Sequence, residues 1–564
     1  MGDISLAECE SNAILPSIVD LRARKNPDRL YGASTWIGTD GNLNLRRITY
    51  RNLSDAVNLC SQWLETRFGK SENYTTLSYA GPNDYRYLIV TMAAAKTGHK
   101  ALLLAPWNSS LAQIKLLDAC NCTIFLAAED SSAVQNEVSA ITAQREMEVH
   151  KFPTLDWLLD EGPKAPFYHF HKTLDELRDQ DYVIIHTSGS TGHPSPMFYK
   201  YGAIAALKHL SAPEKFIPTA PTGNIAEVWS NKCHWMALPP CHMGGVLGLG
   251  AFNIYWNMPM ILSPGDRPIT PDIAAQIFAQ DICEAAFMPP AYLHSLSRSP
   301  DHLDAIRKLK HVLWVGAPWT TPETATAIQS RVEIQAAYGS SEAGPFVLIV
   351  EEQDDYAWKH FHPIMGASFR HASKDLYELV LEKRPDIQEA QFVFQNFPHL
   401  TEYRTKDLFS KHPTREDLWR FRGRTDDIIV LGNGRLIEPA LMESSVAGHP
   451  KVRAALLCSD GKSKVGLLVE AVVPPASAEE SAALLEEIWP IVVSSNAVMN
   501  VFGRVDKPLI LFARKDKPFP RAGKGSVLGP LTLKAYDQEL RDMFRAAERD
   551  LGRCTFGNNI KKRQ

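Results

Sequence analysis

One stretch decides how the chain folds: Tyr182-Val183-Ile184-Ile185-His186-Thr187-Ser188-Gly189-Ser190-Thr191-Gly192-His193-Pro194. Its apolar and β-branched beginning, residues 182–185, has the composition of a buried strand. The six residues that follow His186 are only Gly, Ser or Thr. Small side chains, hydroxyl groups and backbone N–H groups that can turn toward an anion are what a polyphosphate needs. The stretch therefore predicts a strand that ends in a phosphate-binding loop.

Three better-known glycine-rich motifs do not match this loop. A Walker A loop ends in Gly-Lys-Ser/Thr, whereas this loop continues as Gly192-His193-Pro194. A nucleophile elbow needs glycine two residues to either side of the serine, and Ser190 has Ser188 on one side. The dinucleotide spacing G-x-G-x-x-G is also missing. Taken alone, such a Ser/Gly loop is more often a flexible connection than a phosphate site.

Size and composition limit the possible functions. The 564 residues imply two to four domains or subdomains, and 45% apolar with 22% charged residues is typical of a globular protein. A net charge of −4 with mixed signs argues against nucleic-acid binding. Residues 233–265 contain no charged side chain, but prolines and asparagines interrupt them, so we expect a buried core with a pocket and no membrane span.

The cysteines and the termini indicate the compartment that we expect. The nine cysteines include no CxxC pair, which favours reduced thiols over disulfides or zinc ligands. The acidic N-terminus does not have the pattern of a signal peptide, and the C-terminal residues 561–564 are not a peroxisomal address. We therefore expect a cytoplasmic protein.

Strands alternate with helices along most of the chain, which predicts mainly parallel sheets and an α/β fold. Strands are predicted at residues 46–50, 75–79, 100–104, 123–127, 182–185, 285–288, 311–315, 376–381, 391–394, 452–457, 465–473 and 508–512. Helices are predicted at residues 85–97, 130–144, 203–210, 481–494 and 533–548.

Four further motifs lie downstream of the loop. They are Tyr338-Gly339-Ser340-Ser341-Glu342-Ala343-Gly344, Tyr403-Arg404-Thr405-Lys406-Asp407, Gly423-Arg424-Thr425-Asp426-Asp427 and Pro520-Arg521-Ala522-Gly523-Lys524-Gly525. In this order and spacing, the five motifs resemble those of the adenylate-forming superfamily over almost the whole chain. Residues 81–87 and 521–525 resemble most the adenylation domains of fungal enzymes of secondary metabolism that are similar to nonribosomal peptide synthetases, in particular aryl carboxylic acid reductases.

The resemblance implies a fold and a reaction. The fold would be a large, multi-layer α/β part, residues 1–425, which binds ATP and the acid, and a small mobile α+β part, residues 426–564, with the hinge at Asp426. The reaction would be the attack of a carboxylate on the α-phosphate of ATP, which yields an acyl-adenylate and pyrophosphate. Catalysis of such a step is mostly positioning and electrostatic stabilisation.

The resemblance also assigns residues to ATP and Mg²⁺. Lys524, Glu342 and Thr191 would be catalytic, Glu342 as the carboxylate that holds Mg²⁺. Asp407 would accept hydrogen bonds from the ribose, and Lys524 would bridge the carboxylate and the nucleotide. The full predicted ATP site is Thr187, Ser188, Gly189, Ser190, Thr191, Gly192, Gly316, Ala317, Pro318, Tyr338, Gly339, Ser340, Ser341, Asp407 and Arg424.

One residue departs from the family pattern. Relatives continue the phosphate loop as Gly-x-Pro-Lys, but this chain has Ser195 where the lysine is expected. A cation near the pyrophosphate is therefore missing. Lys200 and His193 are the two candidates to replace it.

The acid pocket is predicted around residues 238–245. Amino-acid-activating relatives place an Asp where this chain has Met243, and a buried ammonium without that partner would be costly. We therefore expect a flat, apolar acid, with an aryl acid first and arylpyruvates or medium-chain fatty acids as alternatives. The predicted lining is His242, Met243, Gly244, Phe287, Met288, Val315 and Ala337, with a purely structural role of His242 as the less favoured alternative.

The acceptor of the acyl group stays open. No phosphopantetheine-carrying serine motif follows Lys524, so the chain is either free-standing or part of a longer enzyme. The leading expectation is transfer to the phosphopantetheine thiol of a carrier protein supplied in trans. An acyl-CoA synthetase, an amide-forming ligase and a nucleotide-binding pseudoenzyme are the alternatives.

Overall fold

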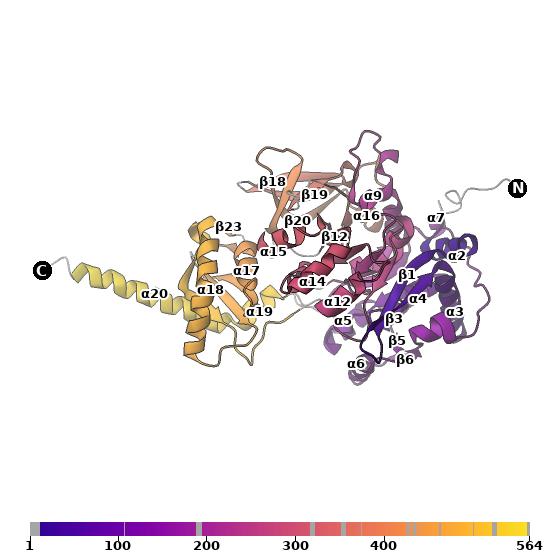
Figure 1. Ribbon diagram of the computed structural model, residues 1–564, viewed down its shortest axis with the longest axis horizontal. Coiled ribbons are helices and arrows are strands. Elements are labelled where there is room, and N and C mark those ends of the chain that lie inside the picture. Colours follow the sequence, from indigo (N-terminus) through magenta and orange to yellow (C-terminus); the bar gives the residue numbers. More distant parts are fainter. Residues whose placement is uncertain are drawn as a thin grey trace.

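Buried strands build two mainly parallel sheets in the larger, N-terminal part of the molecule (Figure 1). The computed structural model describes residues 12–560 except 107, 188–193, 316–321, 351–356, 374, 426–428, 432–435, 438, 462–463, 500 and 522–526.

The first sheet has the order β6-β5-β3-β4-β7-β8. Its strands are β3 (Thr76–Ala80), β4 (Lys100–Leu103), β5 (Ile124–Ala128), β6 (Glu148–Phe152), β7 (Asp181–His186) and β8 (Pro196–Lys200). All pairs are parallel except β7 with β8, which form a hairpin around the predicted phosphate loop. The helices between these strands are α4 (Arg86–Lys96), α5 (Ser110–Ala119) and α6 (Ser132–Thr142). The predicted β7 and α4 are thereby confirmed.

The second sheet has the order β13-β12-β11-β9-β10-β1-β2, and only the β1–β2 pair is antiparallel. Its strands are β1 (Leu30–Ile37), β2 (Leu43–Thr49), β9 (His234–Met236), β10 (Met260–Leu262), β11 (Ala285–Met288), β12 (His311–Trp314) and β13 (Glu333–Ala336). The associated helices are α2 (Leu15–Lys25), α3 (Tyr50–Phe68), α12 (Pro271–Phe278), α13 (Pro290–Leu296), α14 (Pro300–Ala305) and α15 (Pro322–Gln329).

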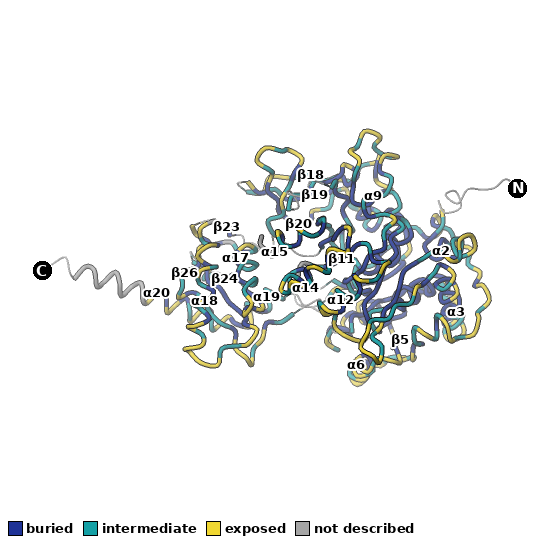
Figure 2. The backbone as a smooth tube through the Cα atoms, viewed as in Figure 1, coloured by how far each residue is buried: buried dark blue, intermediate teal, exposed yellow. Residues whose placement is uncertain are grey.

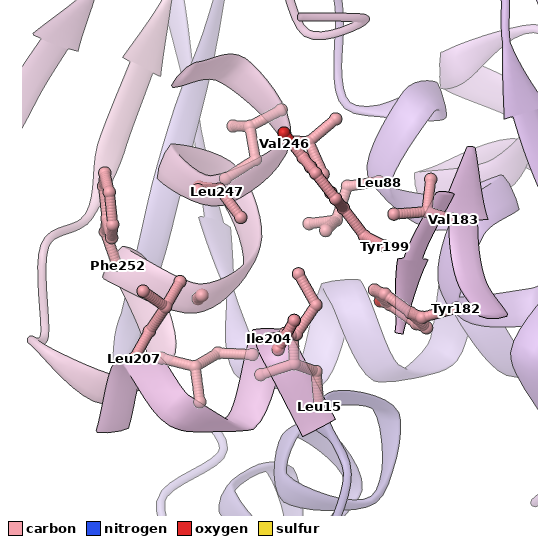
Figure 3. Close-up of a cluster of buried hydrophobic side chains, with 14 of the residues drawn as sticks. Leu15, Leu88, Tyr182, Val183, Tyr199, Ile204, Leu207, Val246, Leu247 and Phe252 are labelled. Carbon is pink, nitrogen blue, oxygen red and sulfur yellow. The ribbon is translucent and has the colours of Figure 1, made fainter. Parts of the chain in front are cut away.

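The charge-free residues 233–265 lie in the core of this part, as expected. They form β9, α10 (Met243–Leu247), the π-helical turn η4 (Gly248–Phe252), α11 (Asn253–Tyr255) and β10. Figure 3 shows how Val246 and Leu247 of this segment share one apolar cluster with Leu88 and Ile204. Among the described residues, no helix is both long enough and apolar enough to cross a membrane.

A third, entirely antiparallel sheet follows, with the order β16-β17-β21-β20-β19-β18. Its strands are β16 (Leu348–Ile349), β17 (Trp358–Phe361), β18 (Ala367–Ser373), β19 (Leu376–Glu382), β20 (Glu402–Lys411) and β21 (Leu418–Arg424). The strand predicted at residues 391–394 is wrong, because this segment begins the helix α16 (Phe392–Asn396). Such a short apolar run has no periodicity that separates a strand from a buried helix, and here Phe392, Val393 and Phe394 are all buried.

The remaining chain forms a smaller part at the other end of the molecule (Figure 1). Its sheet has the strands β24 (Val452–Ser459), β25 (Val465–Ala471) and β26 (Val505–Phe512), and its helices are α17 (Ala440–Ala447), α18 (Ala478–Val498), α19 (Gly529–Ala535) and α20 (Asp537–Ile560). Two apolar clusters of its own lie on the two faces of this sheet, and Figure 2 shows its buried centre and exposed rim. The predicted α/β class, with a large part followed by a small α+β part, is confirmed.

Candidate functional site

The predicted acid pocket lies at the carboxyl ends of adjacent parallel strands, where α/β sheets bind ligands. The backbone continues the sheet beyond the strands, because Ala237 N donates to Phe287 O at 3.0 Å and Ala337 N donates to Trp314 O at 2.8 Å. Val315 N similarly donates to Met288 O at 3.3 Å. Residues that lie up to 50 positions apart in the sequence are thus side by side at one edge.

Phe287 and Met288 do not share a wall of this pocket. Successive residues of a strand point to opposite faces. Phe287 joins the cluster between the two large sheets, whereas Met288 is fully buried in the cluster on the other face, against α12 to α15. Trp229, which the sequence did not indicate, is buried beside Phe287, with ring centroids 6.4 Å apart. Its indole N–H donates to Gln335, which fixes the ring.

The segment with His242, Met243 and Gly244 follows β9 in the sequence and forms the start of α10. His242 is the residue before α10, and all three residues are half-buried. A Cβ atom on Gly244 would lie 2.4 Å from Leu238 Cδ1, and one on Gly245 would lie 2.0 Å from Pro239 O. The backbone atoms near Gly245 exclude a side chain there, so α10 can approach the preceding loop closely, whereas at Gly244 the Leu238 side chain would have to move.

Three predicted nucleotide residues from separate segments are in direct contact. Asp407, on β20, accepts a short hydrogen bond from the hydroxyl of Tyr338 and one of 3.2 Å from Arg424 Nη1 on β21. Tyr338 lies in β14 (Tyr338–Ser340), and the ring contacts Phe346, Phe361 and Phe409. Burial, and secondly the Asp407 carboxylate, raise the pKa of Tyr338 well above its usual range, so the phenol stays a donor.

The turn with Glu342 connects β14 to β15 (Gly344–Phe346) and lies beside the first sheet. Tyr199, on β8, donates to Ser341 O at 2.9 Å, and Ala343 N donates to Ser340 Oγ at 3.1 Å. The hairpin with Gly339, Ser340 and Ser341 is half-buried, as is Glu342 itself. The contact through Tyr199 holds this carboxylate next to the hairpin that carries the phosphate loop.

The base of the phosphate loop is closed by one backbone hydrogen bond, from Thr187 N to Ser195 O at 2.9 Å. The rest of the loop, Ser188, Gly189, Ser190, Thr191 and Gly192 with His193, lies outside the described residues. Lys200, one of the two candidates to replace the missing cation, has its backbone at the other end of the hairpin from this loop. In the strand register the backbone of Lys200 is opposite that of Asp181, whereas the loop follows the His186–Pro196 pair. Four residues separate Lys200 from Pro196, which is roughly 13 Å at the usual rise of a strand.

In the smaller part, the two ends of the predicted lysine loop, Arg521 and Val527, are held together, and we call this pair the neck of the loop. Arg521 and Val527 form an antiparallel bridge. Glu470, which is 3% exposed on β25, accepts from Phe519 N at 3.0 Å and from the Arg521 guanidinium. Lys524, the predicted hinge Asp426 and the predicted slot residues Gly316, Ala317 and Pro318 lie outside the described residues. Neither Tyr199 nor Glu470 was indicated by the sequence, because no motif contains them.

Comparisons with known proteins agree with the motifs. The family model "AMP-binding enzyme" matches residues 20–373, and "AMP-binding enzyme C-terminal domain" matches residues 426–548. The carboxylic acid reductase of Neurospora crassa is 29% identical over 95% of this chain and 51% of its own length. An isocyanide synthase–NRPS hybrid of Aspergillus fumigatus is 27% identical over 96% of this chain and 34% of its own. The chain thus spans about half or less of the length of these relatives.

Among solved structures, the O-succinylbenzoate coenzyme A synthetase of Bacillus subtilis in complex with ATP and a magnesium ion has the same fold. It superimposes with a TM-score of 0.64 at 18% identity, over 91% of this chain and 98% of that one.

Proposed function

The chain belongs to the family of AMP-binding enzymes, and from this we propose that it adenylates a carboxylic acid with ATP and releases pyrophosphate. The observation that carries the proposal is the contact of Tyr338, Asp407 and Arg424, three motif residues from three segments, next to the predicted acid pocket. Hydrogen bonds from Tyr338 and Arg424 orient the Asp407 carboxylate, a group whose oxygens can accept from ribose hydroxyls.

In the reaction, a carboxylate oxygen of the acid attacks the α-phosphorus of ATP, and the bond from that phosphorus to the pyrophosphate oxygen breaks. The chain's own groups orient the reactants. Asp407 accepts from the ribose, and Tyr338 packs beside the base. Arg424 and Lys524 contribute positive charge where the phosphoryl oxygens gather negative charge. The residues of the 187–192 loop donate to the β- and γ-phosphates.

Glu342 suits a hydrated Mg²⁺. Mg²⁺ in nucleotide sites keeps several waters and uses one or two carboxylates together with substrate phosphates. No cluster of three or more potential metal ligands exists among the described residues, and a single half-buried carboxylate agrees with that mode of binding. When bound, the ion neutralises phosphate charge, and Glu342 together with the Tyr199–Ser341 contact fixes where it is held.

We propose an aryl acid as the substrate. Met243 and Gly244 lie at the start of α10, and Phe287 and Trp229 pack together at the strand ends; none of these four described residues carries a carboxylate that could pair with an ammonium. Transfer of the acyl group to a thiol would follow: the thiolate attacks the acyl carbon and AMP leaves. We propose the phosphopantetheine of a carrier protein as acceptor, in keeping with a reductase and a synthetase hybrid as relatives. Coenzyme A and an amine are the alternatives.

We further propose that the part that begins at Asp426 rotates about this residue between the two half-reactions, so that Lys524 acts only in the first. A cytoplasmic location is proposed from the seven cysteines whose side chains the structure describes, which are all buried free thiols.

The test is acid-dependent exchange of pyrophosphate into ATP, measured with benzoates, arylpyruvates, medium-chain fatty acids and all proteinogenic amino acids. We expect exchange with one or more aryl acids and none with amino acids. Strong exchange with an amino acid would contradict the argument from Met243, and no exchange with any acid would contradict the adenylation itself. With an active acid, carrier protein, coenzyme A and amines are then compared as acceptors.

A further inference from the structure

His186 ends β7, directly before the phosphate loop, and none of the predicted roles includes it. Its side chain is 3% exposed. Its Nε2 atom lies 3.3 Å from Nδ2 of Asn108, and its ring centroid lies 6.0 Å from that of His242. The imidazole therefore lies next to Thr187, where the predicted phosphate loop begins, and close to His242, a predicted residue of the acid pocket.

The fold explains why Asn108 reaches His186. β4 and β7 are neighbours in the first sheet, with Ala101 opposite Val183, so the loop after β4 and the end of β7 share one edge. Asn108 is held in this loop because its N–H donates to Ala105 O at 3.1 Å. Gln113, which is fully buried on α5, donates from its amide to Ala105 O at 3.3 Å.

The contact with Asn108 determines the protonation of the ring. Burial lowers the pKa of His186 to about 4, and the backbone of Thr187 offsets only part of this fall, so the imidazole is neutral at neutral pH. The amide nitrogen of Asn108 can only donate, and Nε2 must therefore accept. The single ring proton is consequently on Nδ1.

This N–H group completes no hydrogen bond of regular geometry. Nδ1 of His186 is buried, and within the part of the chain that the structure describes only the backbone of Thr187 interacts with the ring on this side, without forming such a bond. Buried donors are almost always paired, so an unpaired one at the edge of a site requires an explanation. Nδ1 is bonded to Cγ and lies closer to its own backbone than Nε2 does, which directs the donor to Thr187, where the loop begins.

We propose that Nδ1–H of His186 donates a hydrogen bond to a phosphate oxygen of bound ATP. This inference rests on the proposed use of ATP. It also supplies a donor near a loop in which Ser195 stands where relatives have a lysine and from which Lys200 is remote. His186 thus joins the residues that bind the nucleotide, and Asn108 is the positioning residue that selects the tautomer.

Two amide variants separate the two ring nitrogens. In His186→Asn the side-chain amide nitrogen occupies the place of Nδ1, so the donor toward the phosphate is kept and the contact with Asn108 is lost. In His186→Gln the amide reaches the place of Nε2, so the contact with Asn108 is kept and the donor toward the phosphate is lost. His311→Gln serves as a control, because His311 is another buried histidine (2% exposed), on β12 of the other sheet.

The measurement is the dissociation constant of ATP with Mg²⁺ by isothermal titration calorimetry, with thermal unfolding as a check of folding. A lost hydrogen bond to a charged group predicts about 10- to 100-fold weaker ATP binding in His186→Gln. His186→Asn should recover most of this loss, and His311→Gln should bind ATP like the parent. The exchange assay should show the same order in KM for ATP, with KM for the acid little changed.

The proposal is overturned if a folded His186→Gln protein binds ATP within about twofold of the parent, or if both amide variants lose the same affinity, which would indicate a packing role. A change confined to KM for the acid would assign the donor to the carboxylate and also overturn it. Calorimetry does not depend on which acid is used. A parent protein that binds ATP but exchanges no pyrophosphate therefore contradicts the proposed reaction and still leaves His186 testable.

Discussion

Replacing the buried Lys359 by methionine should stabilise the protein at neutral pH. Lys359 lies on β17 and is 5% exposed, and its ammonium is 5.3 Å from the ring centroid of Trp314. No carboxylate forms an ion pair with it among the described residues. Burial, and secondly the positive charge of Arg420, lower the pKa of Lys359 from 10.5 to about 8.

The size of the effect follows from this fall in pKa. The unfolded chain holds the proton more tightly, so at pH 7, below both pKa values, folding carries the full cost of the buried charge, about 3 kcal/mol. The cation–π contact with Trp314 returns about 1–2 kcal/mol of this when it is desolvated. Methionine has nearly the same length and no charge. We therefore expect Lys359→Met to gain about 2 kcal/mol at pH 7 and about 2 °C in the apparent midpoint of thermal unfolding.

The pH dependence distinguishes this explanation from better packing. Between pH 8 and 10.5 the unfolded chain binds more protons than the folded one, so the stability of the parent rises with pH through this window. The advantage of the variant should fall to about half by pH 9.5. Thermal unfolding of both proteins at several pH values is the assay, and Lys411→Met, at the exposed last residue of β20 in the same sheet, should stay within about 0.5 kcal/mol of the parent. A Lys359→Met protein that is less stable at pH 7, or whose advantage does not shrink with pH, would refute the reasoning.

Three further predictions concern the two half-reactions. Glu342→Gln keeps the side-chain shape and removes the charge for Mg²⁺, so the exchange rate should fall about 10²-fold and respond less steeply to Mg²⁺ concentration, whereas an unchanged Mg²⁺ titration would contradict the role. Lys524→Ala should slow adenylation about 10²–10³-fold and leave thiol transfer from chemically supplied acyl-adenylate nearly intact, and an equal fall in both steps would show the assignment to be wrong. Glu470→Gln weakens the ion pair with Arg521 at the neck of the lysine loop. The rate of adenylation should therefore fall about tenfold, with KM for ATP nearly unchanged. An exchange rate equal to that of the parent would show that Glu470 does not support the loop.

The sequence alone was sufficient for the features that depend on local composition and on motifs. The β-branched run at 182–185 predicted β7, helical spacing at 85–97 predicted α4, and alternation of strands and helices predicted the parallel sheets. The motifs also named Tyr338, Asp407 and Arg424 as one site, and the structure brings these three into contact. Each of these predictions uses residues whose role is set by their neighbours in sequence or by a motif.

Only the tertiary structure decided which of the remaining residues meet. Residues 391–394 became a helix because burial on all sides overrides the strand-like composition, and Met288 faces away from Phe287 because adjacent strand residues alternate. Lys200 lies far from the loop because it ends the hairpin, and His186 finds Asn108 because β4 and β7 are neighbours. Strand order and register are set by packing between distant segments, so contacts of this kind leave no signal in any single stretch of the chain.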